Sequence, residues 1–111
     1  MKKIGLKTDR PCGFYDMTTK VESLLSPRDS GVIFLFCPHT TAGITINEGA
    51  DPDVLTDINN SLTRIIPKKE NYRHIEGNSD AHIKASIIGF SLSIFVEEGR
   101  LILGTWQKVF F

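Results

Sequence analysis

The chain contains few of the residues and runs that mark a disulfide-stabilised or membrane protein. It has two cysteines in 111 residues, and they lie far apart at Cys12 and Cys37 without forming a Cys-x-x-Cys pair. Its longest clean apolar run, Val32 to Cys37, is far shorter than the roughly 18 residues of a membrane-spanning helix. The first residues, Met1 to Lys7, carry no apolar signal core. We therefore expect a cytoplasmic protein in a reducing compartment, with no membrane partner.

The chain also lacks an excess of either charge. Lys plus Arg equal Asp plus Glu at 13 each, so the formal net charge is zero. A general nucleic-acid surface is not indicated, and we expect no nucleic-acid partner. Zero net charge on a small domain favours association, so an oligomer is expected. With 41% hydrophobic and 23% charged residues, the chain has the composition of one globular domain, residues 1–111.

Sequence motifs for several common chemistries are missing as well. The chain has no Gly-x-Ser-x-Gly elbow, no Walker-type loop and no dinucleotide fingerprint. It also has no His-Glu-x-x-His or paired-cysteine metal motif. Serine or cysteine nucleophile chemistry is therefore not indicated, and a site has to be assembled from separate segments.

Hydrophobic periodicity predicts the order of helices and strands. In the first half of the chain we expect a peripheral strand over 2–8 and a short helix opened by a capping box at Thr19 and closed by Pro27. A strand buried on both faces follows over 32–37, and a further strand over 43–47. In the second half we expect a helix over 52–66, a loop over 67–78, a helix over 79–88, and strands over 90–96, over 101–103 and from 109 onward.

The two longer helices have the clearest end signals. Asp51 is a good N-cap for the 52–66 helix, and Pro52 suits its first position. Segment 79–88 alternates like a strand as well, but Gly89 directly after it favours a helix. The helix interpretation places His82 and Ser86 on one face.

Polar residues concentrate directly after the predicted 32–37 strand. The sequence Pro38-His39-Thr40-Thr41 stops the apolar run abruptly, which is typical of a buried strand that leads into a functional loop at the rim of a sheet. His39 can ligate a metal or transfer a proton near neutral pH. A histidine beside threonine is also common as a hydrogen-bonded turn residue, so both interpretations stay open.

The chain has three histidines in different segments, His39, His74 and His82. Three imidazoles can converge on a metal and leave one position open for water or substrate. Further ligands or acid–base groups are available at Glu48, Asp51, Asp53 and Asp80. Asp51 and Asp53 are also explained as helix-capping groups. Lys84 can hold a phosphate as a point charge.

Together these motifs resemble the YjbQ-like proteins, which are described as secondary thiamine-phosphate synthases. The matching segments follow the family order over about residues 16–111: Pro38 to Gly43, Ile46 to Glu48, Asp51 to Asp53, Tyr72 to His74, Gly77 to Ser86 and Leu103 to Gln107. The resemblance implies an α+β fold, a single two-layer domain with a mixed β-sheet and a few helices, assembled as a homotrimer. Family members continue past Phe111 through a further strand, so sheet completion and trimer packing are expected to be affected.

The resemblance also implies a site and a reaction. It assigns a divalent metal, zinc or magnesium, to His39, His74 and His82, catalytic roles to Glu48, Asp80 and Lys84, and substrate contacts to Thr40, Thr41, Asn47, Asn78 and Ser86. The implied reaction joins a hydroxymethylpyrimidine pyrophosphate to a thiazole phosphate with loss of pyrophosphate, so the expected partner is a small phosphorylated metabolite. Two alternatives stay open: a non-catalytic trimeric module that binds a metabolite or anion, and histidines that are buried polar residues in a subunit interface.

Overall fold

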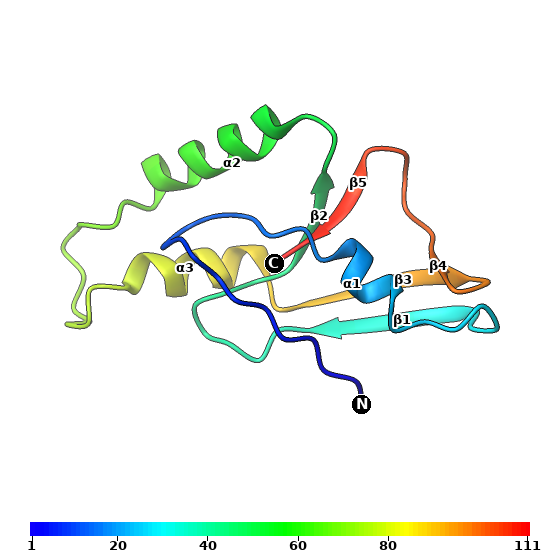
Figure 1. The fold of residues 1–111 in the computed structure, drawn as a ribbon. Helices are drawn as coiled ribbons and strands as arrows, with labels where there is room; N and C mark the ends of the chain where they lie inside the picture. The colour runs from blue at the N-terminus through cyan, green and yellow to red at the C-terminus, as the bar shows by residue number, and fades with distance from the viewer.

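The strands lie in two antiparallel sheets, with the helices arranged around them (Figure 1). The computed structural model describes residues 1–111, and its elements are α1 (Thr18–Glu22), β1 (Gly31–Phe36), β2 (Thr45–Glu48), α2 (Pro52–Ile65), α3 (Ser79–Ile88), β3 (Ser91–Glu97), β4 (Arg100–Leu101) and β5 (Gln107–Phe110). One sheet has the order β1-β3-β4, and β2 pairs with β5 in the other. The α+β class is confirmed. The strand pairs are all antiparallel and divided between two sheets, where the resemblance implied one mixed sheet.

The core lies where α1 meets both sheets. Six buried apolar side chains form its centre: Met17, Val21, Ile94, Val96, Leu101 and Val109. Val21 comes from α1, and Val109 of β5 is 1% exposed. A side chain of this size stabilises the fold by roughly 1.5–3 kcal/mol when fully buried. The short helix α1 therefore joins the two sheets through apolar contact.

β5 is hydrogen-bonded along both of its edges. One edge pairs with β2 in antiparallel register. The other edge receives the segment before α1, where Tyr15 and Phe111 exchange two N–H···O bonds of 2.9 Å. The Met17 amide then donates to the Val109 carbonyl at 2.7 Å, and the Val109 amide donates to the Thr18 hydroxyl at 2.9 Å. These bonds fix the start of α1 against the C-terminal strand.

Both longer helices begin and end close to the predicted residues. α2 starts at Pro52, and the Asp51 carboxylate caps it by accepting from the Asp53 amide at 2.9 Å, which supports the capping interpretation. α3 covers 79–88, so the helix interpretation of this ambiguous segment is confirmed. Gly89 at its end has a φ of 94°, a conformation that suits glycine. No helix of the chain has the length and apolar content to cross a membrane.

The predicted strand over 2–8 is wrong, because these residues form no ladder with either sheet. Side chains hold the segment instead. The Lys20 amine donates to the Gly5 carbonyl at 3.3 Å, and Ile4 and Leu6 pack at the edge of the core. Two apolar side chains can be buried in this way without a partner strand, so their alternation alone did not define one.

The helix predicted from a capping box at Thr19 exists, but its cap is different. α1 starts at Thr18, whose amide donates to the Asp16 carboxylate at 2.9 Å. The Glu22 carboxylate, which was expected to complete the capping box, accepts from the Leu101 amide at 3.2 Å. A tertiary bond to β4 therefore replaces the predicted local one, and α1 ends at Glu22, before the predicted end at Pro27.

The prediction that residues 32–37 are buried on both faces is wrong for β1. Ile33 and Leu35 pack against the core, but Phe34 and Phe36 on the opposite face are 80% and 67% exposed. Burial of the second face requires another layer, and within one chain none packs there. Phe95 of β3 lies opposite Val32 of β1 on this same outer face. We define the aromatic face as Val32, Phe34, Phe36 and Phe95.

The hairpin between β3 and β4 depends on glycine at position 99. Glu98 and Gly99 have φ values of 49° and 77°, and a Cβ at Gly99 would lie 2.6 Å from the Ser26 carbonyl oxygen. Gly99→Ala is expected to lower the free energy of unfolding by roughly 2 kcal/mol through backbone strain and this clash. Urea denaturation measures the loss.

Gly77→Ala separates the two causes. The φ of Gly77 is 79°, but no atom lies within 4 Å of the Cβ that alanine would add. This variant is expected to lose only the backbone part, about 1 kcal/mol. Equal losses in the two variants would show that the contact with Ser26 contributes nothing.

Candidate functional site

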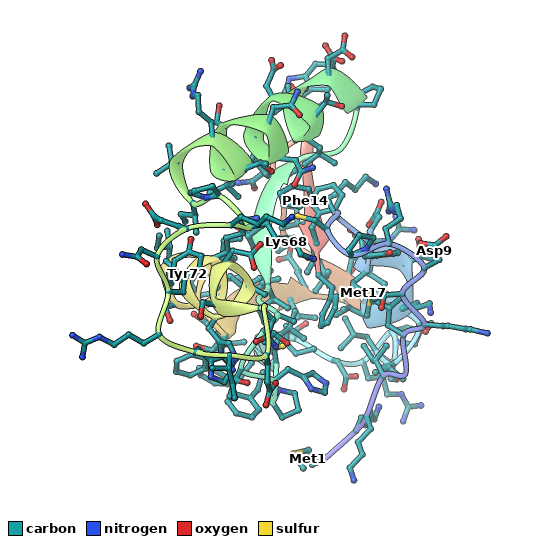
Figure 2. All side chains as sticks on the ribbon, turned by 90° about the vertical axis from the view of Figure 1, so that its left-hand side faces the viewer. Met1, Asp9, Phe14, Met17, Lys68 and Tyr72 are labelled. Carbon is teal, nitrogen blue, oxygen red and sulfur yellow. The ribbon has the colours of Figure 1, made fainter.

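A cavity of about 540 Å³ opens where the N-terminal segment, the loop after β1 and α3 meet. Five of the predicted site residues line it: His39, Thr41, Asn78, Asp80 and Lys84. Apolar side chains complete the wall, among them Leu62 of α2, Phe110 of β5 and Phe14, which lies beneath α2 in Figure 2. This space, which we call the α3 cavity, combines polar side chains of α3 with apolar ones of α2 and β5.

An ion pair between Lys84 and Asp80 forms part of the polar wall. The two side chains are four residues apart on α3, their N···O distance is 3.4 Å, and they are 12% and 13% exposed. A lysine ammonium has three N–H donors, so the bond to Asp80 leaves two for other partners. Because water reaches this pair poorly, a charged group in the cavity interacts with it more strongly than it would at the surface.

Asn78, the residue before α3, has a buried side-chain oxygen without a hydrogen-bond partner. Its backbone carbonyl accepts from the Ala81 amide at 3.0 Å at the start of the helix. An unpaired buried acceptor costs about 1–3 kcal/mol, so native structures contain few of them. Asn78 also lines the α3 cavity.

A second, more open hollow of about 640 Å³ adjoins the first. It contains four predicted site residues, His39, Thr40, His82 and Ser86. His82 and Ser86 lie on one face of α3 as predicted, and the Ser86 hydroxyl donates to the His82 carbonyl at 2.9 Å. His39 lines both spaces. We call this second space, which Phe36 and Phe90 also line, the histidine hollow.

The three histidines are not arranged as ligands of one metal. The rings of His74 and His82 pack edge to face with centroids 5.5 Å apart, and His74 Nε2 lies 3.8 Å from a Glu76 carboxylate oxygen. No group of three or more His, Cys, Asp or Glu side chains in the chain has the geometry to hold a metal ion. The three-histidine metal site therefore stays a prediction, and the side chains of a single chain do not fit it.

His74 lies outside both spaces, and so do two further predicted site residues, Asn47 and Glu48. They are on β2, opposite Lys108 and Gln107 of β5, and the Asn47 side chain accepts from the Glu48 amide at 2.8 Å. Thr45, two residues earlier on the same face, does line the α3 cavity. Distance along the strand therefore separates Asn47 from the cavity.

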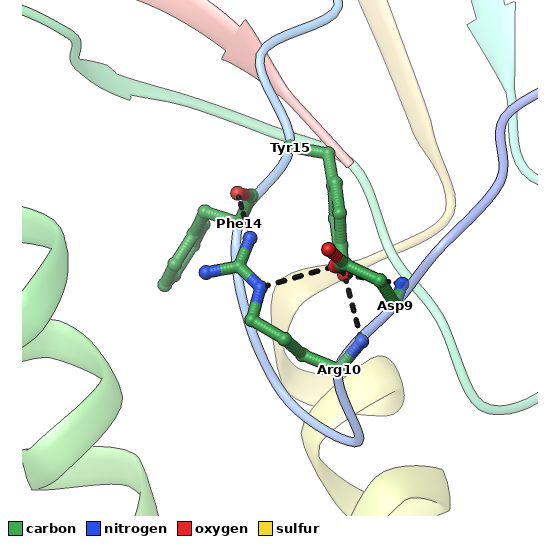
Figure 3. A network of polar contacts seen from close by, with 4 residues as sticks. All are labelled: Asp9, Arg10, Phe14 and Tyr15. Carbon is green, nitrogen blue, oxygen red and sulfur yellow. Dashed lines mark hydrogen bonds and ion pairs between the residues drawn. The ribbon is translucent and has the colours of Figure 1, made fainter.

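The N-terminal segment lines the α3 cavity with residues that sequence analysis did not select, including Arg10 and Tyr15. The Tyr15 hydroxyl donates to the Asp9 carboxylate at 2.8 Å and accepts from the Asp9 amide at 3.0 Å (Figure 3). The Arg10 guanidinium lies 4.7 Å from the centre of the Tyr15 ring and donates to the Phe14 carbonyl at 3.3 Å. No motif in the sequence marks these residues.

Tyr72 is held within the loop over 67–78. Its hydroxyl donates to the Pro67 carbonyl at 2.6 Å. Partial burial first, and then the carboxylates of Glu70 and Asp80, raise the pKa of Tyr72 above its ordinary value of 10.0. The phenol is therefore neutral near pH 7, and the loop places it within electrostatic range of Asp80.

The chain matches known proteins over almost its whole length. The family described as UPF0047 protein YjbQ-like matches residues 2–111. UPF0047 protein MJ1081 from Methanocaldococcus jannaschii is 48% identical over 111 residues, which cover 98% of this chain and 80% of that protein. UPF0047 protein YugU from Bacillus subtilis is 46% identical over 114 residues, which cover 100% of this chain and 86% of that protein.

Solved structures share the fold. The crystal structure of an uncharacterised conserved protein of the YjbQ/UPF0047 family from Clostridium acetobutylicum has a TM-score of 0.91 at 52% identity, covering 96% of this chain and 84% of that one. The conserved hypothetical protein TT1486 from Thermus thermophilus has a TM-score of 0.86 at 47% identity, covering 88% and 78%. These matches define a small α+β domain with the YjbQ fold. The chain belongs to the YjbQ-like UPF0047 family.

The Asp9 carboxyl group reports on the N-terminal network. The hydrogen bond from Tyr15, with a smaller effect of the Arg10 guanidinium, lowers the pKa of Asp9 below its ordinary value of 3.8. Tyr15→Phe removes the hydroxyl and is expected to raise this pKa toward the ordinary value, as NMR titration of the carboxyl carbons measures. Tyr72→Phe, which leaves the hydroxyl of Tyr15 in place, is the control and should leave the Asp9 pKa unchanged.

The lowered Asp9 pKa also sets the sign of a pH effect on stability. Because the folded-state pKa is the lower one, the network stabilises the fold above the ordinary carboxyl pKa. This contribution is lost as the pH falls through the folded-state pKa. The stability difference between wild type and Tyr15→Phe is therefore expected to shrink on acidification below the ordinary pKa. A difference that stays constant down to the most acid pH would contradict this role of Asp9.

Proposed function

We propose that the α3 cavity binds a small phosphorylated metabolite and that the protein is an enzyme acting on it. The observation that carries this proposal is the position of Lys84, whose side chain is 12% exposed and lines the cavity together with His39 and Thr41. A lysine ammonium binds phosphate as a point charge, and the attraction is stronger where water is excluded.

Neutral hydrogen-bond donors surround this charge. The Thr41 hydroxyl and the His39 imidazole can each donate to a phosphate oxygen. The cavity also reaches the N-terminus of α3, a helix of ten residues whose dipole favours an anion there. Asp80 is bonded to Lys84 and orients its ammonium. A phosphoryl group in the cavity would therefore meet a fixed charge, two side-chain donors and a helix N-terminus.

The proposed reaction joins two phosphorylated metabolites with loss of pyrophosphate, as in the secondary thiamine-phosphate synthases that the sequence resembles. Lys84 would stabilise the negative charge that develops on the departing pyrophosphate, and His39 would donate a hydrogen bond to it. Asn78, which also lines the cavity, would help to position the substrate. These roles use groups of this chain alone.

A non-catalytic binding module is the second candidate function. The bond between Asp80 and Lys84 favours it, because this bond already balances the lysine charge in the α3 wall. Such a module would bind the phosphorylated ligand at the same residues and release it unchanged.

We also propose that the protein works as a homotrimer, with the number of copies taken from the family resemblance. The exposed aromatic face supports association, because monomeric proteins rarely expose large contiguous apolar patches. The dimensions of the chain support it too. Its radius of gyration is 15.4 Å, above the value of about 13 Å for a compact domain of this length.

Pyrophosphate binding tests the role of Lys84. Calorimetric titration of the wild type with pyrophosphate is expected to show binding. Lys84→Gln should weaken it at least about tenfold, or about 1.4 kcal/mol, because a neutral amide replaces a charged donor. Lys69→Gln is the matched control, since Lys69 is exposed on the 67–78 loop and lies outside the cavity. Equal weakening in both variants would contradict a specific role for Lys84.

A turnover assay on the same variants separates the enzyme from the binding module. Wild type supplied with hydroxymethylpyrimidine pyrophosphate and thiazole phosphate is expected to release pyrophosphate over many turnovers, and Lys84→Gln to lose this activity while its circular dichroism stays native. Pyrophosphate binding without product identifies the binding module. No binding by the wild type overturns both functions.

A further inference from the structure

We propose that Arg10 is a second anion-binding residue of the α3 cavity and holds a phosphoryl group separate from the one at Lys84. In the proposed reaction, Lys84 would hold the pyrophosphate of one substrate and Arg10 the phosphate of the other. This inference rests on the proposed function, because it takes the α3 cavity as the phosphate site. It goes further by assigning a second subsite to a residue outside every motif of the sequence.

Arg10 gives the wall of the α3 cavity its excess of positive charge. Arg10 and Lys84 both line the cavity, the first from the N-terminal segment and the second from α3. The only carboxylate side chain in the same wall is Asp80, which is paired with Lys84. The charge of Arg10 is therefore not balanced within the wall, and it attracts an anion into the cavity.

Contacts within the N-terminal segment hold the Arg10 guanidinium in place (Figure 3). Its Cζ lies 4.7 Å from the centre of the Tyr15 ring, its Nη2 donates to the Phe14 carbonyl at 3.3 Å, and its Nε lies 3.4 Å from an Asp9 carboxylate oxygen. Because these contacts restrict the side chain before a ligand arrives, less conformational entropy is lost on binding.

The Nη1 group of Arg10 takes part in none of these contacts and lies beside Gly13. A Cβ at Gly13 would lie 3.0 Å from Arg10 Cζ and 3.3 Å from Nη1. Gly13 lines the α3 cavity as well, so the glycine leaves space next to Nη1 that a side chain would occupy. Nη1 carries two N–H donors, and the planar guanidinium suits the oxygens of a phosphate.

A structural brace for the N-terminal segment is the alternative role for Arg10. The Tyr15 hydroxyl, however, bonds directly to the Asp9 carboxylate at 2.8 Å and accepts from the Arg10 backbone amide at 3.2 Å. These bonds need no guanidinium. Tyr15 therefore positions Arg10, rather than the reverse, and the charged end of Arg10 is available for a ligand.

Two separate cations suit a cavity that holds two phosphoryl groups. The volume of about 540 Å³ is within the range of small-molecule sites and exceeds what one phosphoryl group fills. Two such groups in one space repel each other, and a cation beside each one offsets the repulsion. Lys84 alone, with its charge already balanced by Asp80, would not provide this.

The test measures by NMR where inorganic phosphate binds. Isotope-labelled wild type and variants are titrated with phosphate at constant ionic strength, and the Nε–H resonance of each arginine reports on its own surroundings. Arg10→Lys removes one resonance and so assigns Arg10. Arg73, which is exposed on the 67–78 loop and lies outside the cavity, is the internal reference.

The Arg10 resonance is expected to shift and to saturate, and that of Arg73 is not. Lys84→Gln should change the phosphate affinity at Arg10 by less than about threefold, because separate sites act almost independently. Arg10→Gln, followed at the Gly13 amide, should weaken phosphate binding there at least about tenfold, since it loses a charged donor. Arg10→Lys should weaken it less, because the charge remains and only the planar fork is lost.

Three results would overturn the proposal. Equal responses of Arg10 and Arg73 would mean that phosphate is an adventitious ion only. Loss of the Arg10 response in Lys84→Gln would mean that both residues hold a single anion. A lowered urea midpoint in Arg10→Gln, with phosphate binding at the Gly13 amide unchanged, would establish the structural brace.

Pyrophosphate titration of Lys84→Gln separates this inference from the proposed function. A saturable response of Arg10, with pyrophosphate binding that does not depend on Lys84, supports the Arg10 subsite and removes the Lys84 site. Pyrophosphate binding through Lys84 without a response of Arg10 keeps the proposed function and overturns the second subsite. Failure of both titrations overturns both proposals.

Discussion

The double pairing of β5 is the constraint on which the rest of the structure depends. β5 bonds to β2 along one edge and to the segment before α1 along the other, and its Val109 amide donates to the buried hydroxyl of Thr18. Because an unpaired buried amide is costly, this bond ties α1 to β5 at a fixed position. The pairing also places Tyr15 and Phe111 in the wall of the α3 cavity. The first and last segments of the chain therefore shape the same cavity.

α3 distributes the polar residues of the site between two spaces. Asp80 and Lys84 lie four residues apart and line the α3 cavity, while His82 and Ser86, also four apart, line the histidine hollow. This division follows from helical geometry, since residues at a spacing of four share a face and residues two apart do not. His39 belongs to both spaces because its loop lies where they adjoin. A single helix thus presents polar side chains to two adjoining spaces.

Local signals explain which parts could be predicted from the sequence. α2 and α3 were predicted correctly because their end signals, Asp51 with Pro52 and the terminal Gly89, act on adjacent residues. The exposure of β1 could not be predicted, since burial of a sheet face depends on whether another layer covers it. The place of Arg10 and Tyr15 in the cavity wall depends on bonds between segments and left no pattern in the sequence. Sequence motifs indicated His39, Asp80 and Lys84, and all three line the α3 cavity. They also indicated Asn47, but Asn47 lies farther along β2 and outside the cavity.

A crystal structure of the protein grown with pyrophosphate would show most directly whether the α3 cavity is an anion site built around Lys84. We expect a pyrophosphate ion within hydrogen-bonding distance of Lys84 Nζ, with contacts to His39 or Thr41 and with the Lys84–Asp80 pair retained beside it. A well-ordered cavity at saturating pyrophosphate that contains only water would rule out this anion site, as would an ion bound elsewhere on the chain.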